Sequence, residues 1–302
     1  MAARASIATT WLQSCSGCHI ALLDLHDKLL DVLESIEVKY SPIMDAKRIP
    51  EVDIGLIEGA VGNDDNEEIL KRFRQRAKRI VALGTCACFG GIPGLRNLFN
   101  CGDVLQRGYV ETESTVNGKI PTGTDLPSLK KHVVPIDQVI EVDYYIPGCP
   151  PLPEAIEDAL MALIEGRTPQ RKTRNLCAEC SRKKEKMLLA SRDFVTDAVL
   201  APHELEQIDP DRCFLEQGVL CMGPATCEGC RARCLNGNMP CRGCMGPTPD
   251  ALEQGAKIIN ALASILPAGG MLFQEDIVGV GYRYSLPVSI FPHLADEGGG
   301  RA

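Results

Sequence analysis

The sequence predicts an α/β protein in which a doubly wound parallel sheet is followed by a smaller, irregular domain. Three observations lead to this prediction. Short apolar runs alternate with helical patterns through the first half of the chain. A polar, proline-containing linker follows at residues 166–175, and nine of the fifteen cysteines then fall between residues 177 and 244. We therefore expect two domains, over residues 1–167 and 168–302.

The strands and helices of the first domain are read from apolar patterns. Compact apolar runs bounded by turns predict strands buried on both faces, at residues 6–12, 52–59, 79–84 and 139–148. Amphipathic patterns predict helices at 19–35, at 66–78 and from Pro153 onward. In the first helix the apolar side chains of one face are Leu22, Leu25, Leu29, Val32 and Leu33. This alternation is typical of a parallel sheet with helices on both faces.

The second domain has little regular apolar pattern. Only residues 185–195 and 251–266 indicate short helices, in a region otherwise rich in glycine, proline and cysteine. Such a segment has too little apolar surface to bury by itself, so we expect inorganic centres to supply the missing order.

Composition excludes several classes of protein. A net charge of −8 over 302 residues argues against a nucleic-acid binder. The first residues show neither a secretory signal pattern nor a twin arginine. The apolar stretch 258–273 is short for a membrane span and is interrupted by Pro267, Gly269 and Gly270. We expect a cytoplasmic chain with no membrane contact, where abundant cysteines indicate metal or redox chemistry rather than structural disulfides.

Cysteines follow three predicted strands of the first domain. Cys15 and Cys18 follow the first strand, Cys86 follows the run at 79–84, and Cys149 follows the run at 139–148. Because the carboxyl ends of parallel strands lie along one edge of the sheet, these four thiols can converge there. Cys88 could replace Cys86, but it lies farther from the strand end.

The second domain supplies two further groups of four cysteines. One group consists of Cys177, Cys180, Cys213 and Cys221. The other consists of Cys230, Cys234, Cys241 and Cys244. Cys88, Cys101 and Cys227 are left without a predicted ligand role.

Three chemistries are open for these groups. Zinc takes four cysteines and fits the second domain better than the edge of a well-formed sheet. A thioredoxin-like disulfide between Cys15 and Cys18 would leave Cys86 and Cys149 unexplained. Iron–sulfur clusters held by four thiolates fit all three groups. Glu58 lies at a strand end on the same edge of the sheet. Two roles are open for it: a helix or turn cap, or a hydrogen-bonding partner near the cluster.

Several motifs resemble those of one known family. The segments "CSGCHIALL", "GTCACFGG" and "PGCPPLPEAI" resemble the three proximal-cluster motifs of nickel–iron hydrogenase small subunits. Downstream, "CMGPATCEGC" and "PCRGCMGP" are similar to the medial and distal cluster segments of that family. The resemblance covers nearly the whole chain, and it implies a flavodoxin-like first domain and a second domain that carries clusters.

The resemblance also assigns the three groups of cysteines. It implies a proximal 4Fe–4S cluster on Cys15, Cys18, Cys86 and Cys149. A distal one would lie on Cys177, Cys180, Cys213 and Cys221, and a medial one on Cys230, Cys234, Cys241 and Cys244. Respiratory members commonly have a histidine in place of Cys177 and lack a fourth medial cysteine. Cys227 lies close enough in sequence to replace Cys234. Full thiolate ligation favours a low reduction potential.

The resemblance implies partners as well. A large subunit would hold the nickel–iron centre, because this chain lacks the paired "RxCGxC" and "DPCxxC" motifs that bind nickel. We expect the methyl-viologen-reducing type, which passes electrons to an iron–sulfur subunit and heterodisulfide reductase. A sulfhydrogenase-type small subunit is the main alternative. An electron-transfer subunit of a complex-I-like assembly would resemble the first domain only, and a zinc-stapled scaffold would be colourless.

Overall fold

The computed structural model describes residues 4–170, 172–185, 198–199, 207–267, 271–272 and 276–291. The chain divides into two compact units. The first unit consists of Met1–Pro169 together with Tyr284–Ala302, and the second consists of Gln170–Arg283. Each unit is described by itself below.

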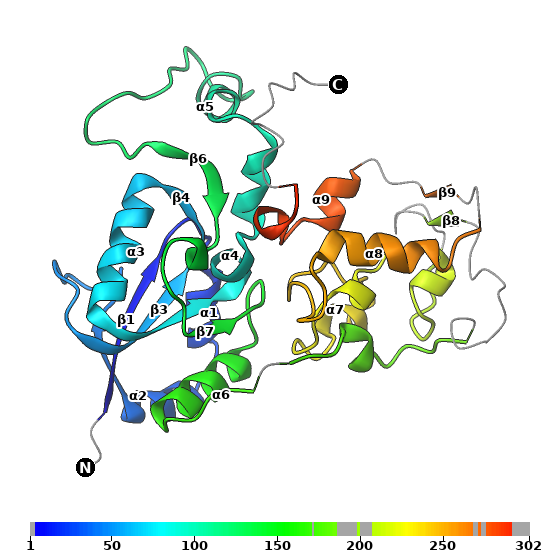
Figure 1. Cartoon of the computed structure of the whole chain (residues 1–302), viewed down its shortest axis with the longest axis horizontal. Coiled ribbons are helices and arrows are strands. Elements are labelled where there is room, and N and C mark those ends of the chain that lie inside the picture. The colour runs from blue at the N-terminus through cyan, green and yellow to red at the C-terminus, as the bar shows by residue number, and fades with distance from the viewer. Residues whose placement is uncertain are drawn as a thin grey trace. The chain divides into compact units, whose positions relative to one another are not determined.

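A five-stranded sheet forms the centre of the first unit (Figure 1). Its strands are β1 (Ala5–Trp11), β2 (Ile36–Tyr40), β3 (Val52–Glu58), β5 (Ala77–Leu83) and β7 (Tyr144–Ile146). They lie in the order β2-β1-β3-β5-β7, and every neighbouring pair is parallel. Counted along the chain, this is the 2-1-3-4-5 order of flavodoxin. The predicted doubly wound, flavodoxin-like fold is confirmed.

Helices cover both faces of the sheet (Figure 1). One face packs against α1 (Gly17–Leu23), α2 (Lys28–Ser35) and α6 (Pro153–Ile164). The other face packs against α3 (Asp64–Arg76) and α4 (Gly84–Phe89). Fully buried side chains such as Leu56 on the first face and Phe73 on the second fill the two layers. Burial on both faces explains why the strands are uniformly apolar.

Further elements surround this core. They are β4 (Val61–Asn63), η1 (Ile92–Leu98), α5 (Cys101–Tyr109), β6 (Leu129–Val134), η2 (Ile136–Gln138) and η7 (Leu286–Val288). Strands β4 and β6 pair antiparallel. Pro287 of η7 packs against Gly90 and Gly94, where an added Cβ would lie 2.3 Å from the proline ring. The segment that contains η7 thereby joins the first unit.

The predicted helix over 19–35 is wrong as a single helix. It is two helices, α1 and α2, with a turn between them in which His26 adopts a left-handed conformation with φ of 53°. Both helices still bury their apolar side chains in the same layer, including Leu25 and Val32. The apolar period therefore continues through the turn and does not reveal the break between the helices. Leu33, which was predicted to lie on the apolar face, is 39% exposed.

Two strand predictions also change. The predicted strand at 139–148 is reduced to β7, because Val139 has helical dihedral angles after η2 and only three residues pair with β5. Strand β2 was not predicted, although Ile36, Val38 and Tyr40 alternate with polar residues as expected for an edge strand. The strand follows α2 without a connecting loop, so its alternation continues directly from the helical pattern.

The second unit contains little regular structure. Its elements are η3 (Leu176–Ala178), β8 (Ala198–Val199), η5 (Leu215–Gln217), η6 (Gly223–Ala225), α7 (Arg233–Asn236), α8 (Gln254–Ala263), β9 (Met271–Leu272) and α9 (Ile277–Gly281). Helix α8 lies within the segment predicted to be helical at 251–266, whereas the one predicted at 185–195 falls almost entirely outside the described residues. In the part of the chain that the structure describes, no helix has the length and apolarity to traverse a bilayer.

Candidate metal centres

The four proximal cysteines lie together at the carboxyl edge of the sheet. Cys15 follows β1, Cys18 lies in α1, Cys86 lies in α4 and Cys149 follows β7. The thiol of Cys18 is buried, and this burial is the main reason why its pKa is raised. The proximity of Glu58 and of the other three thiols raises the pKa further. The sheet therefore brings the four predicted ligands into one electrostatic neighbourhood.

Glycines leave the space that these sulfur atoms occupy. A Cβ on Gly84 would lie 2.2 Å from Cys18 Sγ, and Gly84 has a left-handed φ of 81°. A Cβ on Gly91 would lie 2.7 Å from Cys86 Sγ, at a φ of 52°. Both positions need glycine, since a side chain would strain the backbone and displace a thiol.

Glu58 joins the end of β3 to the start of α1. Its side chain is 1% exposed, and its carboxylate accepts hydrogen bonds from the backbone N–H groups of Cys18 (3.4 Å) and His19 (3.1 Å). The imidazole Nδ1 of His19 contacts the same carboxylate, and its ring packs edge-on against Trp11. A carboxylate is favourable at a helix N-terminus. Glu58 therefore has both expected roles, as the cap of α1 and as a hydrogen-bonding partner beside the cysteines.

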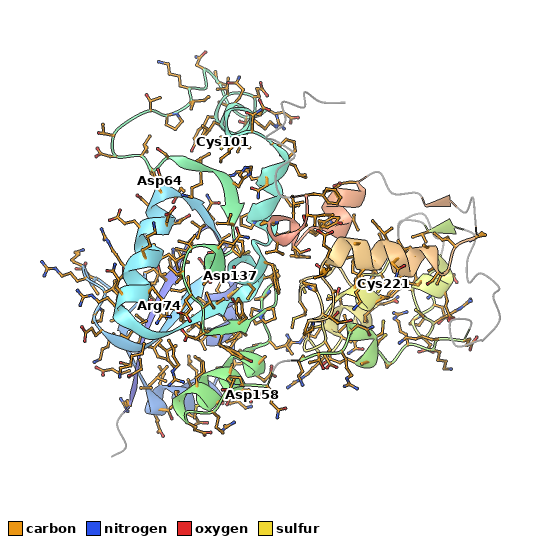
Figure 2. All side chains as sticks on the ribbon, viewed as in Figure 1. Asp64, Arg74, Cys101, Asp137, Asp158 and Cys221 are labelled. Atoms are coloured by element: carbon orange, nitrogen blue, oxygen red, sulfur yellow. The ribbon has the colours of Figure 1, made fainter. Side chains whose placement is uncertain are left out.

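The distal cysteines form a second group, within the second unit. Burial raises the pKa of the Cys177 thiol, and the proximity of Cys213 and Cys180 raises it further, while Lys184 lowers it. Burial raises the pKa of Cys221 to about 12, against N–H donors from Gly223 and Cys241 that lower it. Cys221 lies near α8 (Figure 2).

Gly223 lies between two of these sulfur atoms. A Cβ there would be 3.4 Å from Cys177 Sγ and 3.6 Å from Cys221 Sγ, which places both thiols against one glycine. The structure thus brings Cys177, Cys180, Cys213 and Cys221 together.

The predicted medial cysteines form two pairs, Cys230 with Cys234 and Cys241 with Cys244. Burial, Glu179 and Cys234 raise the pKa of Cys230. Burial, followed by Cys221 and then by Cys244 among the nearby thiols, raises the pKa of Cys241. The Cys241 N–H donates to Cys221 Sγ at 3.4 Å, so this end of the medial group adjoins the distal group.

The chemistry of these thiols fits an iron–sulfur cluster. Burial is the main reason why the pKa is raised in eight of them, Cys18, Cys86, Cys149, Cys177, Cys213, Cys221, Cys230 and Cys241, and the proximity of other thiols or of Glu58, Glu179 or Glu216 adds to it. A centre that carries iron cations would offset both effects. Backbone N–H groups also point at the sulfur atoms, from Ile92 to Cys86 and from Gly243 to Cys241. Hydrogen bonds of this kind tune cluster potentials. Among the described residues, no group of three or more His, Cys, Asp or Glu side chains is arranged to hold a single metal ion.

Comparisons with known proteins decide the family. The chain is 45% identical over 287 residues to a subunit of the vhu F420-non-reducing hydrogenase of Methanocaldococcus jannaschii, covering 94% of this chain and 96% of that protein. It is 36% identical to the iron–sulfur subunit of the F420-non-reducing hydrogenase of Archaeoglobus profundus, covering 90% and 93% respectively. The chain belongs to the iron–sulfur subunit family of the F420-non-reducing hydrogenases.

Two further matches each cover about half of this hydrogenase subunit. Residues 15–163 match the family described as NADH ubiquinone oxidoreductase, 20 Kd subunit. A chain of the NAD+-reducing [NiFe]-hydrogenase in its H2-reduced state matches with a TM-score of 0.54 at 38% identity. That match covers 56% of this chain and 96% of the other. The predicted non-catalytic electron-transfer subunit of a hydrogenase is confirmed, and its likeness to a complex-I-like subunit lies in the first unit.

Sequence reasoning missed several residues of the hydrogenase subunit that contact the cysteine segments. The sequence analysis gives His19 no role, although its place directly after Cys18 is the signal that could have found it. In the segment "CAECSRKK", Glu179 accepts a hydrogen bond from Gly229 N, and Lys184 donates to the Cys177 carbonyl. Arg182 makes further contacts, described below. In the sequence, the only indication of a role for these residues is their position beside a pair of cysteines.

Three cysteines of the hydrogenase subunit bond to backbone carbonyls instead. The Cys88 thiol donates to Ala82 O at 3.6 Å, and the Cys101 thiol, at the start of α5 (Figure 2), donates to Lys130 O at 3.4 Å. The Cys227 thiol donates to Lys172 O at 3.5 Å. These contacts support the prediction that none of the three is a ligand.

Replacing Cys88, Cys101 or Cys227 singly with serine is expected to leave the iron content unchanged, because serine keeps the donor to the same carbonyl. Iron and sulfide are measured on the anaerobically purified complex. Loss of about four irons in Cys227→Ser would contradict the medial assignment, since one cluster of that size would be missing.

Proposed function

We propose that this subunit conducts electrons between the nickel–iron centre of a partner large subunit and an external low-potential acceptor. Three 4Fe–4S clusters, held by the proximal, medial and distal groups, would supply the one-electron carriers. The observation that carries this proposal is the convergence of Cys15, Cys18, Cys86 and Cys149, which follow three separate strands, near the switch point of the sheet. At that point the strand order reverses and an open α/β sheet binds its ligand.

The residues of the chain have distinct tasks in this proposal. Thiolates bind iron, and neighbouring N–H groups donate to their sulfur atoms. Glu58 holds the first turn of α1 so that Cys18 faces Cys86 and Cys149. The contact between Cys241 N and Cys221 Sγ supports a direct path from the medial to the distal group. Electrons would thus enter at the sheet edge and leave near Cys177.

The proposal also names partners for this subunit. Relatives are called hydrogenase subunits, which supports a large-subunit partner that holds nickel. We propose that the acceptor is an iron–sulfur subunit coupled to heterodisulfide reductase, in the cytoplasm. The four-thiolate distal group favours a low potential and hence such an acceptor.

The anaerobically purified complex is expected to contain about twelve irons per copy of this chain, with matching sulfide, from three clusters of four. Iron, sulfide, zinc and nickel are measured together, and nickel is expected to remain with the large subunit when the subunits are separated. Stoichiometric zinc with negligible sulfide would overturn the proposal in favour of a zinc-stapled scaffold.

A further inference from the structure

A buried arginine connects three cysteine-bearing segments of the second unit. Arg182 is 6% exposed, and its Nη1 donates to the carbonyls of Asp209 and Arg212, each at 2.9 Å. Its Nη2 donates to Leu235 O at 3.3 Å and to Asn238 Oδ1 at 2.6 Å. All four acceptors are neutral oxygens, so the guanidinium acts here as a fork of donors.

Each of these contacts lies next to a predicted ligand. Arg182 itself follows Cys180 by two residues. Arg212 directly precedes Cys213, and the ring of Phe214, which follows it, lies 3.9 Å from the guanidinium Cζ. Leu235 directly follows Cys234. One side chain therefore fastens the segment of Cys234 to those of Cys180 and Cys213.

The segment of Cys234 has little support of its own. Helix α7 has only four residues and follows two left-handed residues, Arg231 and Ala232. Cys234 is exposed. A helix this short is not stable by itself, so its orientation depends on contacts from outside. The bonds from Arg182 to Leu235 and Asn238 hold the end of α7 and the turn that follows it.

We propose that Arg182 is a positioning residue that fixes Cys234 at the medial site and so retains the fourth iron of that cluster. This inference rests on the proposed function, because it needs a medial cluster with Cys234 as a ligand. Lysine cannot replace the arginine fully, since its single ammonium group lacks the planar fork that reaches separate carbonyls and stacks on Phe214.

Arg182→Gln, in the complete hydrogenase complex, tests the proposal. With ferricyanide as one-electron oxidant, a [4Fe–4S]2+ cluster that gives up one electron and one Fe2+ becomes [3Fe–4S]+, which has a spin signal. We expect Arg182→Gln to show this signal and to lose about one iron per chain, with the other clusters retained. Arg182→Lys should show a smaller fraction of the same signal.

Arg233→Gln is the matched control. Arg233 directly precedes Cys234, is exposed, and its side chain has no hydrogen bond or ion pair with the described residues. The control should keep the iron content and spectrum of the parent. An equal signal in both glutamine variants, or none in Arg182→Gln, would overturn the proposal. So would loss of the medial and distal irons together, which would show only a folding role.

Two results keep the test decisive. If Arg182→Gln yields no soluble complex, Arg182→Lys decides, and a parent-like spectrum in that variant overturns the proposal. If the parent itself has far fewer than about twelve irons, the proposed function fails first and the inference falls with it. A parent with full iron and a parent-like Arg182→Gln overturns the inference alone.

Discussion

Gly84→Ala is expected to remove the proximal cluster, about four irons per chain, and to abolish hydrogen-dependent dye reduction. The new Cβ would lie 2.2 Å from Cys18 Sγ, so the sulfur atom would have to move away. A free thiol can rotate aside, but a thiolate bound to iron cannot. The left-handed φ of 81° adds about 1–2 kcal/mol of backbone strain.

Gly108→Ala is the matched control for this prediction. Gly108 lies in α5, and an added Cβ there meets nothing within 4 Å. Alanine in a helix favours folding relative to glycine. This variant should therefore keep the iron content and activity of the parent. Full proximal iron in Gly84→Ala would show that Cys18 does not bind the cluster in this geometry.

Cys234→Ser is expected to convert the medial cluster into a 3Fe form. Three thiolates would still hold the remaining irons, so the fold and the other two clusters should persist. The oxidised variant should show a spin signal that the parent lacks and a higher medial potential. Dye reduction should survive. Electron transfer to a low-potential acceptor should fall more strongly, because a medial cluster with a higher potential holds the electron and makes its onward transfer unfavourable.

Cys227→Ser provides the comparison for Cys234→Ser. Both residues flank Cys230, but the Cys227 thiol bonds to Lys172 O, whereas Cys234 lies close enough to Cys230 to raise its pKa. Spin intensity of the oxidised state and the medial potential are measured in both variants. A parent that already shows the full 3Fe signal would exclude Cys234 as a ligand and remove the argument for a low-potential relay.

Much of the first unit could be predicted because its strands are buried on both faces. Runs such as "VDIGLIEG" are apolar throughout and end where the sheet ends, which also placed Cys86 and Glu58 at one edge. The break between α1 and α2 could not be predicted, since the apolar period runs through the turn at His26. Apolar periodicity indicates which side chains face the core, but it does not indicate where the backbone bends.

The contacts around the cysteines were harder to predict than the cysteines themselves. Arg182 is a charged residue in a polar segment, and such residues are usually solvated. Its burial depends on carbonyls from residues 209, 212 and 235, which only the folded chain brings together. Gly84 directly follows an ordinary strand, and the reason why it must be glycine becomes visible only when Cys18 Sγ is placed against it.

The short edge strand β7 has a consequence for the chain before its clusters are inserted. It has three residues, all of which pair with β5, and Cys149 lies three positions after its last residue. In the proposed site, iron would link Cys149 to Cys86 and close the long loop between them. Closing this loop lowers the entropy of the unfolded chain and so stabilises the folded state by about 4 kcal/mol. Without iron, β7 would be held at the edge of the sheet by three residue pairs, and its release would leave β5 as an open, apolar sheet edge. Open edges pair with other chains. The iron-free subunit should therefore tend to self-associate, and insertion of the proximal cluster would act as the step that protects it from aggregation.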